Sequence, residues 1–518
     1  MIGPGELESD AAVRTLEGPT LEGKAARGLA LAGGAFALQR VLVFVATLVL
    51  ARVLVPDDFG LVAFALSVLN FVQVLTDAGL SEAIVYRADA EDDLVSSTAF
   101  WIGVIGSVVL AALVWLGAPS VARFGGTETV PLVRVLAFDF VLAALGNVHE
   151  YRLRHSLQFG RLFVPTTAGA LVTGIVSIAA ALGGAGAWSL VAGILAGSAV
   201  RSLLLWAVCP FRPRLVIARR YLPSLFLFGS GMIAVGFLGE GAKNIDYLIV
   251  GAKLGTTALG IYYVAFRLPE LVILGVVQIA NDVLFPYYAR VNDGAEGAGS
   301  DLGIRYLATL RLAAALVIPA SAGMAALALP IVLALYGEEW RGAVTPMALI
   351  ALWAALASLA AMPGAVFKAL GKSWLLTATG VVQLAVLVPA VTLAASHGIS
   401  AVAGAQVVEK TISLAMLGAV TARVLRVPWY AAFRAAAVPL LMSTVTFAVV
   451  YPVGRALDPY VAIAVGVPLG IGCYATLLRA LMPDVFRTCV APLARLRANR
   501  VAPPLRQQSS RDGVLEGS

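Results

Sequence analysis

The chain has 518 residues, of which 60% are hydrophobic types and only 13% are charged. Soluble domains usually contain about 45–50% hydrophobic and about 25% charged residues. A soluble chain of this length would form several hydrophobic cores and would need many more charged residues on its surface. The composition therefore excludes a soluble multidomain protein. It indicates an integral membrane protein with many spans.

The chain contains no motif that indicates catalysis or a bound cofactor. Its three cysteines and three histidines are scattered, which predicts neither a disulfide framework nor a zinc site. A P-loop sequence, G-x-x-x-x-G-K-[ST], is absent, so ATP hydrolysis by such a loop is not expected. We therefore expect a protein that uses no cofactor or metal, binds no nucleic acid and is surrounded by the lipid bilayer.

A membrane-spanning α-helix needs about 20 mostly apolar residues. Fourteen segments meet this requirement, which predicts an all-α polytopic membrane protein. In chain order they are residues 29–54, 59–79, 97–117, 130–148, 162–183, 187–208, 225–250, 258–285, 305–335, 343–368, 374–395, 399–421, 432–451 and 460–480. We expect a polar tail at 1–28, a basic linker at 209–224 and a basic, partly disordered tail at 481–518.

Lysine and arginine gather on one side of the predicted membrane. With the N-terminus in the cytoplasm, 26 of the 37 fall in cytoplasmic tails and loops, 6 on the opposite side and 5 within spans. Cytoplasmic loops of membrane proteins carry an excess of these residues. We therefore predict a multi-pass protein of the bacterial inner membrane with both termini in the cytoplasm.

Two segments that lie 200 residues apart resemble each other. Residues 49–61 read V-L-A-R-V-L-V-P-D-D-F-G-L, and residues 249–261 read I-V-G-A-K-L-G-T-T-A-L-G-I, with Gly60 and Gly260 in register. Each segment ends one apolar helix, turns within a few residues and begins another. The glycines would allow neighbouring helices to approach closely.

The repeat predicts two related six-helix lobes around a central cavity. Six is an even number, so both lobes enter the membrane in the same direction, as in transporters that hold their substrate between two parallel repeats. The expected units are an N-lobe at 29–208, a C-lobe at 225–421 and two extra helices at 432–480.

Several charged residues fall inside the predicted spans. A charge at the centre of a span costs about 2.5–3.5 kcal/mol on insertion scales, so such residues usually face the interior, pair or line a pathway. The cations that we predict to line a substrate cavity are Arg40, Arg201, Lys243, Arg267 and Lys410. The acids that we predict to serve in coupling or gating are Glu240, Asp246, Glu270, Asp139, Asp282 and Glu409.

Structural roles compete with these functional ones. Glu240, Lys243 and Asp246 lie three residues apart and could form a self-neutralising stripe between helices. Arg201 could extend to the cytoplasmic surface. Glu409 and Lys410 are adjacent and should point in different directions, so at least one of them should need a partner from another helix.

Arg40 is the most informative of the charges. It lies near the middle of the first span, and no acid stands three or four residues away. It must therefore meet water, an anionic substrate or an acid from another helix. The offset of 200 suggests Glu240 as a cross-lobe partner, although Lys243 offers Glu240 a nearer one.

Several sequence blocks together resemble one transporter family. They include L-A-R-V-L-V-P-D-D-F-G at 50–60, T-D-A-G-L-S-E-A-I-V-Y-R at 76–87, N-I-D-Y-L-I-V-G-A-K-L-G at 244–255 and A-L-G-I-Y-Y-V-A-F-R-L-P at 258–269. In order and spacing they resemble the Wzx-type polysaccharide exporters, which are lipid-linked oligosaccharide flippases of the MOP superfamily. The blocks are most similar to the colanic-acid and teichuronic-acid exporter type.

This resemblance implies that the protein flips undecaprenyl-pyrophosphate-linked oligosaccharides across the inner membrane by alternating access, and that it is not an enzyme. Its implied partners are the lipid-linked glycan and the glycosyltransferases and polymerase of the same pathway. A multidrug or lipid II transporter of the same superfamily remains an alternative. A membrane glycosyltransferase or polymerase is a third interpretation, but the longest predicted extracytoplasmic loop has only about a dozen residues.

Overall fold

The computed structural model describes residues 21–77, 93–156, 158–218, 222–275 and 298–488, together with Leu284, Tyr287 and Tyr288. These residues form helices and connecting turns, with no strand among them. The first set of helices, which we call the first lobe, comprises α2 (Leu21–Val53), α3 (Pro56–Asp77), α5 (Asp93–Gly125), α6 (Thr129–Leu136), α7 (Phe138–His155), α8 (Phe159–Leu182) and α9 (Ala187–Val208).

The second set, which we call the second lobe, is interrupted by short π- and 3-10-helical turns. It comprises α10 (Leu222–Leu254), α11 (Thr256–Pro269), η2 (Glu270–Leu274), α13 (Ala298–Ala326), α14 (Ala328–Ile331), η3 (Val332–Tyr336), η4 (Glu338–Ala343), α15 (Val344–Ala369), α16 (Trp374–Ala394), η5 (Ala395–His397) and α17 (Ile399–Leu425). The chain continues into α18 (Ala431–Ala456) and α19 (Pro459–Leu481), which pack against each other and against α13.

The multi-span, all-helical architecture predicted from the sequence is confirmed. Eleven helices in the described ranges are long and apolar enough to cross a membrane. Three further predicted segments overlap α2, α10 and α17, the helices that carry most of the predicted site charges. Helix therefore occurs in every predicted segment within the residues that the structure describes, while the number of spans stays a prediction.

One predicted span, 305–335, is wrong as a single helix. Helix α13 ends at Ala326, and α14, η3 and η4 follow before α15 begins. The break follows from Pro330, which lies four residues after Ala326. Proline has no N–H, so it cannot donate the helical hydrogen bond to the Ala326 carbonyl, and α13 ends at that residue. Gly337, at φ 112°, then supplies the left-handed turn between η3 and η4.

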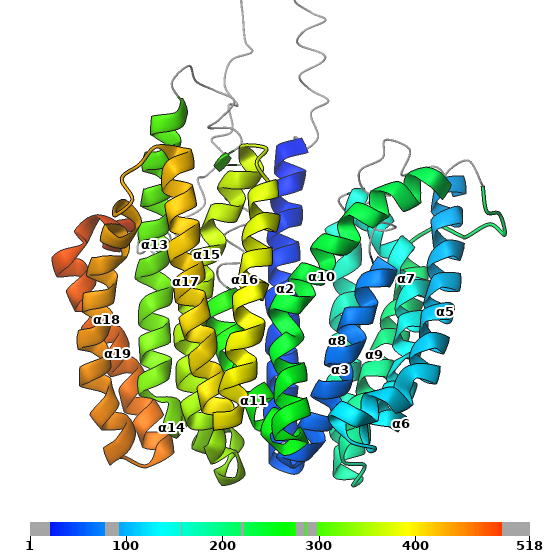
Figure 1. Ribbon diagram of the computed structural model, residues 1–518, viewed down its shortest axis with the longest axis horizontal. Coiled ribbons are helices and arrows are strands. Elements are labelled where there is room, and N and C mark those ends of the chain that lie inside the picture. The colour runs from blue at the N-terminus through cyan, green and yellow to red at the C-terminus, as the bar shows by residue number, and fades with distance from the viewer. Residues whose placement is uncertain are drawn as a thin grey trace, which may run out of the picture.

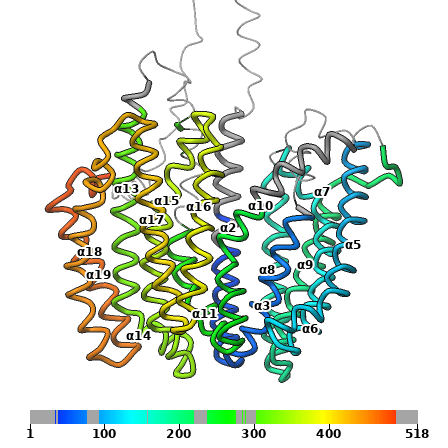
Figure 2. The backbone as a smooth tube through the Cα atoms, viewed as in Figure 1, coloured from blue at the N-terminus to red at the C-terminus, as the bar shows by residue number. Residues whose placement is uncertain are grey.

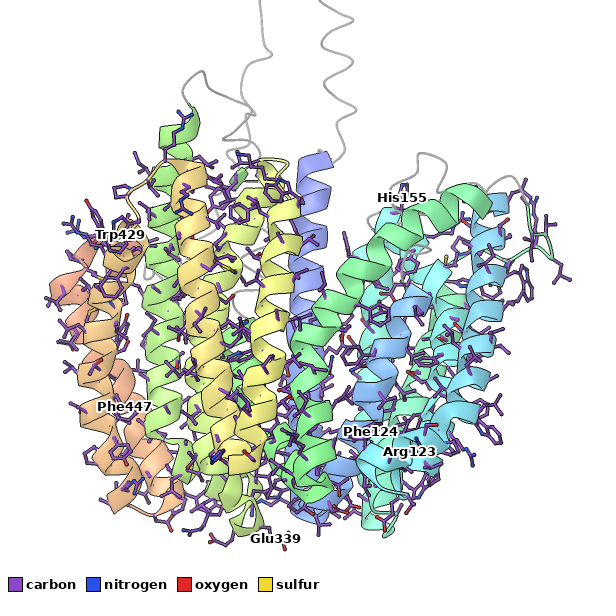
Figure 3. The ribbon with its side chains drawn as sticks, viewed as in Figure 1. Arg123, Phe124, His155, Glu339, Trp429 and Phe447 are labelled. Atoms are coloured by element: carbon purple, nitrogen blue, oxygen red, sulfur yellow. The ribbon has the colours of Figure 1, made fainter. Side chains whose placement is uncertain are left out.

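The two lobes lie side by side, and the helices turn at two common ends (Figure 1). Helix α10 runs obliquely from beside α5 at the upper end to the lower centre, where it packs between α3 and α16. Helix α19 ends toward the upper end of the bundle (Figure 2), the end at which α2 begins (Figure 1). The connections rich in arginine lie at this upper end, near His155 and Trp429, whereas Arg123 and Glu339 lie near the lower end (Figure 3).

The lobes meet at the lower end through a reciprocal contact between α3 and α11. A Cβ atom on Gly60 would lie 1.7 Å from the Thr256 carbonyl oxygen, and one on Gly260 would lie 1.8 Å from the Pro56 carbonyl oxygen. Each contact is the image of the other under the offset of 200 residues, which supports the internal repeat. Asp57 reinforces it by accepting a hydrogen bond from the Thr256 hydroxyl at 2.5 Å.

Candidate functional site

A cavity of about 470 Å³ lies between the lobes. Its walls come from α2 and α3 of the first lobe and from α10, α11, η2, α15, α16 and α17 of the second. Seven of the predicted site residues line it: Arg40, Lys243, Arg267, Lys410, Glu240, Asp246 and Glu270. The sequence separates these residues by up to 370 positions, and helix packing brings them together. Among the described lining residues, four cations and three carboxylates give a net charge of +1.

Two arginines share one carboxylate in this cavity. Arg40 Nη1 lies 2.7 Å from Glu270 Oε1, and Arg267 Nη1 lies 3.5 Å from Glu270 Oε2. The Arg267 guanidinium also lies over the ring of Tyr263, 3.9 Å from its centroid. Of the partners that the sequence left open for Arg40, the structure shows an acid from another helix. That acid is Glu270 and not Glu240, the cross-lobe candidate suggested by the offset of 200 residues.

The local sequence explains why Glu270 reaches both arginines. Its spacing of three residues from Arg267 places the two side chains on neighbouring positions of one helical turn. Pro269 ends α11, and η2 continues as a π-helical turn in which the Gly275 N–H donates to the Glu270 carbonyl. Such wide turns change the angle at which side chains leave a helix and occur often at functional sites. Here the turn directs Glu270 toward α2.

Glu240 pairs within its own helix instead. Lys243 Nζ lies 3.0 Å from Glu240 Oε1, and Asn244 Nδ2 donates to Glu240 Oε2 at 2.8 Å. Asn70 of α3 in turn donates to Asn244 Oδ1 at 3.4 Å, which connects the pair to the first lobe. Glu240 and Lys243 therefore neutralise each other, but they do so at the cavity wall and not buried between helices.

Asp246 does not belong to that stripe. It is 2% exposed, and it accepts hydrogen bonds from the Tyr262 hydroxyl at 2.9 Å and from Gln406 Nε2 at 2.5 Å. Gln406 Nε2 also donates to the Tyr262 hydroxyl oxygen at 2.7 Å. This buried group joins α10, α11 and α17 through neutral donors. Sequence spacing could not reveal it, because its three members come from three helices.

Lys410 and Glu409 pair with each other despite being adjacent. Lys410 Nζ lies 3.4 Å from Glu409 Oε2, and both side chains are almost fully buried. Lys410 lines the cavity and lies 6.0 Å from the ring centroid of Trp353, whereas Glu409 does not line it. The two side chains leave α17 in different directions, since only Lys410 lines the cavity, but their charged ends still meet.

Two predicted cavity residues belong elsewhere. Arg201 pairs with Glu150, which also binds Arg154 at 2.7 Å, inside the first lobe. Asp139 lies on α7 near Arg201 and Ser198, and neither Asp139 nor Arg201 lines the central cavity. Each of these helices, α7 and α9, packs within the first lobe and presents its charge there. Asp282 lies outside the described residues.

Aromatic side chains form a second part of the cavity wall that sequence reasoning missed. Tyr247, Tyr263, Phe266 and Trp353 line the space beside the arginines. In the described part of the chain, no protein group hydrogen-bonds to the hydroxyls of Tyr247 and Tyr263 or to the Trp353 indole N–H. These groups are available to a ligand. Aromatic residues in apolar helices are usually assigned to the buried core. Only their position beside the charged residues in the structure distinguishes these four as cavity lining.

A larger cavity, of about 850 Å³, lies between α13, α15, α17 and α18. Arg455 is its one charged lining residue, and most of its wall is alanine and leucine. It therefore offers an apolar surface and not an ionic site. Among the described residues, no group of three or more His, Cys, Asp or Glu side chains is arranged to hold a metal ion.

Comparison with known proteins places the chain among polysaccharide-pathway membrane proteins. A family model described as "Polysaccharide biosynthesis protein" matches residues 49–345, which is more than half of the chain. The chain is 27% identical over 307 residues to the teichuronic acid biosynthesis protein TuaB of Bacillus subtilis, covering 58% of this chain and 62% of that protein. It is 28% identical over 323 residues to the succinoglycan biosynthesis transport protein ExoT of Rhizobium meliloti, covering 62% and 63% respectively.

The chain therefore spans about three fifths of the length of these relatives. Among solved structures, it is similar to the lipid II flippase MurJ in an inward closed conformation, with a TM-score of 0.73 and 13% identity. That similarity covers 88% of this chain and 100% of the MurJ chain. At this identity the likeness shows the fold alone.

Proposed function

Because the chain belongs to the polysaccharide biosynthesis protein family, we propose that it flips lipid-linked oligosaccharides across the bacterial inner membrane. The substrate class is a glycan carried on a polyprenyl pyrophosphate such as undecaprenyl pyrophosphate. The transport step is alternating access, in which the two lobes open the cavity first to one side and then to the other. The protein acts as a transporter and not as an enzyme.

The observation that carries this proposal is the convergence of Arg40 and Arg267 on one point of the cavity. Guanidinium groups stay charged and bind phosphate oxygens through two parallel hydrogen bonds. One arginine comes from each lobe, so a pyrophosphate held between them would contact both halves of the transporter. Lys410 and Lys243 add positive charge to the same cavity.

The aromatic wall suits the glycan. Sugar rings present apolar C–H faces that pack on aromatic rings, together with hydroxyls that need hydrogen-bond partners. Tyr247, Tyr263 and Trp353 offer both features beside the arginines. A pyrophosphate at the arginines would thus place the first sugars against these rings.

The closed lower end sets the orientation. The upper end carries the arginine-rich connections and the end of α19, and by the positive-inside rule this supports a cytoplasmic position for that end. The Gly60–Gly260 contact then closes the extracytoplasmic side. In this arrangement substrate enters from the cytoplasmic leaflet, and opening of the glycine contact releases it outside. The pathway's glycosyltransferases would supply the substrate, and its polymerase would consume it.

The test is a flipping assay in proteoliposomes with a fluorescent undecaprenyl-pyrophosphate oligosaccharide, lipid II and a cationic drug as three separate substrates. We expect movement of the oligosaccharide lipid and loss of that movement in Arg40→Ala. Movement of lipid II alone or of the drug alone would instead favour the corresponding transporter of the same superfamily. Glycan synthesis by the purified protein in detergent would favour a glycosyltransferase or polymerase.

A further inference from the structure

Glu270 occupies the position between the two arginines. Its oxygens lie 2.7 Å from Arg40 and 3.5 Å from Arg267, one oxygen to each guanidinium. Two carboxylate oxygens in this arrangement present the same acceptors that two phosphate oxygens would present. The anion now bound by the arginines is thus a side chain of the protein itself.

This internal ion pair is accessible from the cavity. The side chains of Arg40, Glu270 and Arg267 are 37%, 32% and 25% exposed, and all three line the cavity. Ion pairs at this level of exposure are weak, because solvent competes for both partners. A doubly charged pyrophosphate can therefore compete with a single carboxylate for the same guanidinium groups.

The surroundings allow Glu270 to leave while Arg267 stays in place. Arg267 stacks on the Tyr263 ring at 3.9 Å, an attraction that does not involve Glu270. Glu270 begins a π-helical turn directly after Pro269, where the regular pattern of helix hydrogen bonds is interrupted. An interrupted turn can change its backbone conformation at lower cost than the middle of a regular helix.

We propose that Glu270 is an internal counter-ion, which holds the arginines when the cavity is empty and which the substrate's pyrophosphate displaces. This inference rests on the proposed function, because it specifies how the same cavity receives its anionic headgroup. The Arg40–Glu270 pair joins α2 of the first lobe to η2 of the second. Displacement of Glu270 by substrate therefore replaces this internal tie with one made through the pyrophosphate, which lasts only while substrate is bound.

The proposal predicts that loss of the Glu270 charge raises the affinity for anions, a direction that an ordinary stabilising ion pair would not give. Removal of the Glu270 charge should strengthen anion binding, because the arginines no longer have to release a competitor. Glu240 is the matched control: it is a carboxylate of the same cavity, but its partner Lys243 lies on the same helix. Loss of either acid changes the cavity charge equally, so only the difference between them reports on the shared arginine site.

The experiment is isothermal titration of inorganic pyrophosphate into the full-length protein in lipid nanodiscs. We expect Glu270→Gln and Glu270→Ala to bind about threefold to tenfold more tightly than wild type, as loss of a weak competing pair allows. Glu270→Asp, which keeps the charge, should stay within about twofold of wild type, and Glu240→Gln should strengthen binding less than Glu270→Gln does. Arg40→Ala and Arg267→Ala should bind more weakly.

The outcomes separate the two proposals. The counter-ion proposal is overturned if wild type binds pyrophosphate through the arginines but Glu270→Gln and Glu270→Ala both bind equally or more weakly. That result would leave the proposed pyrophosphate site standing. Equal strengthening by Glu240→Gln also overturns it, because the effect would then be one of net charge. Absence of binding in every variant overturns both proposals. Size-exclusion profiles identify any variant that does not fold. If one of Glu270→Gln and Glu270→Ala does not fold, the affinity of the other decides between these outcomes.

Discussion

Arg40 of α2 and Glu270 of η2 lie 230 residues apart in the chain and form a 2.7 Å ion pair between the lobes. A charge swap tests whether this pair matters for transport. Arg40→Glu and Glu270→Arg should each impair flipping, and the double variant should recover part of it. Recovery will be incomplete, because Arg267 would then lie beside a second cation. The swap of Arg40 with Glu240 is the control and should recover nothing.

Arg40 should also be needed for substrate binding itself. Arg40→Ala should lower the affinity for pyrophosphate by about 10- to 100-fold, the range expected for a lost charge-assisted hydrogen bond. Arg40→Lys should lie between the two, because an ammonium group lacks the guanidinium fork. Arg201→Ala is the control, since Arg201 pairs with Glu150 outside the cavity. Equal losses in Arg40→Ala and Arg201→Ala would remove Arg40 from the binding site.

The glycine contact should control closure of the lower end. Gly60→Ala or Gly260→Ala would place a methyl group less than 2 Å from a backbone oxygen of the other lobe. Overpacking of this kind costs about 1–3 kcal/mol, so the closed arrangement should become less populated. Thiol labelling of a cysteine introduced at Ser67, which is buried at the cavity wall on α3, should therefore become faster than in a parent that carries this cysteine alone and both glycines.

Gly106→Ala serves as the control for this experiment. An added Cβ at Gly106 would have no neighbouring atom within 4 Å, so labelling should not change. Labelling rates that are the same in the Gly60, Gly260 and Gly106 variants would show that the glycine contact does not hold the lobes together.

The buried Asp246 group should contribute to stability through Tyr262. Tyr262→Phe removes the hydroxyl that donates to Asp246 and accepts from Gln406, and a lost hydrogen bond to a buried charged group costs about 1.5–3 kcal/mol. The melting temperature in detergent should fall clearly. The neighbouring change Tyr263→Phe removes a hydroxyl without a protein partner in the described chain, so it should stay within about 0.5 kcal/mol of wild type. Equal melting temperatures for the two variants would contradict this role.

Topology can be tested at two sites. Reporter fusions at residue 518 and in η4 near Arg341 should indicate opposite compartments, with residue 518 in the cytoplasm. The bias of lysine and arginine toward one side motivates this expectation. The same compartment for both fusions would invalidate the arrangement of fourteen spans.

The sequence by itself determined where the helices lie and which charges are unusual. Both are local properties: a span needs a continuous apolar length, and a charge inside such a length is costly enough to require a polar environment. This is why helix occurs in every predicted segment as far as the structure describes it, and why seven predicted charges line one cavity. The blocks around Gly60 and Gly260 likewise indicated the family and the internal repeat, but not that the two glycines meet between the lobes.

Only the tertiary structure decided which charge meets which. An offset of 200 residues compares depth in the membrane but not rotation about a helix axis, so it suggested Glu240 and did not point to Glu270. A helix turns by about 100° per residue, so Glu240 and Asp246, six positions apart, point about 120° away from each other. Asp246 therefore meets Tyr262 and Gln406, while Glu240 meets Lys243 and Asn244. The π-turn after Pro269 and the oblique path of α10 depend on the packing of several helices together. Partner choice inside a membrane protein therefore follows from helix rotation and crossing, which no single segment encodes.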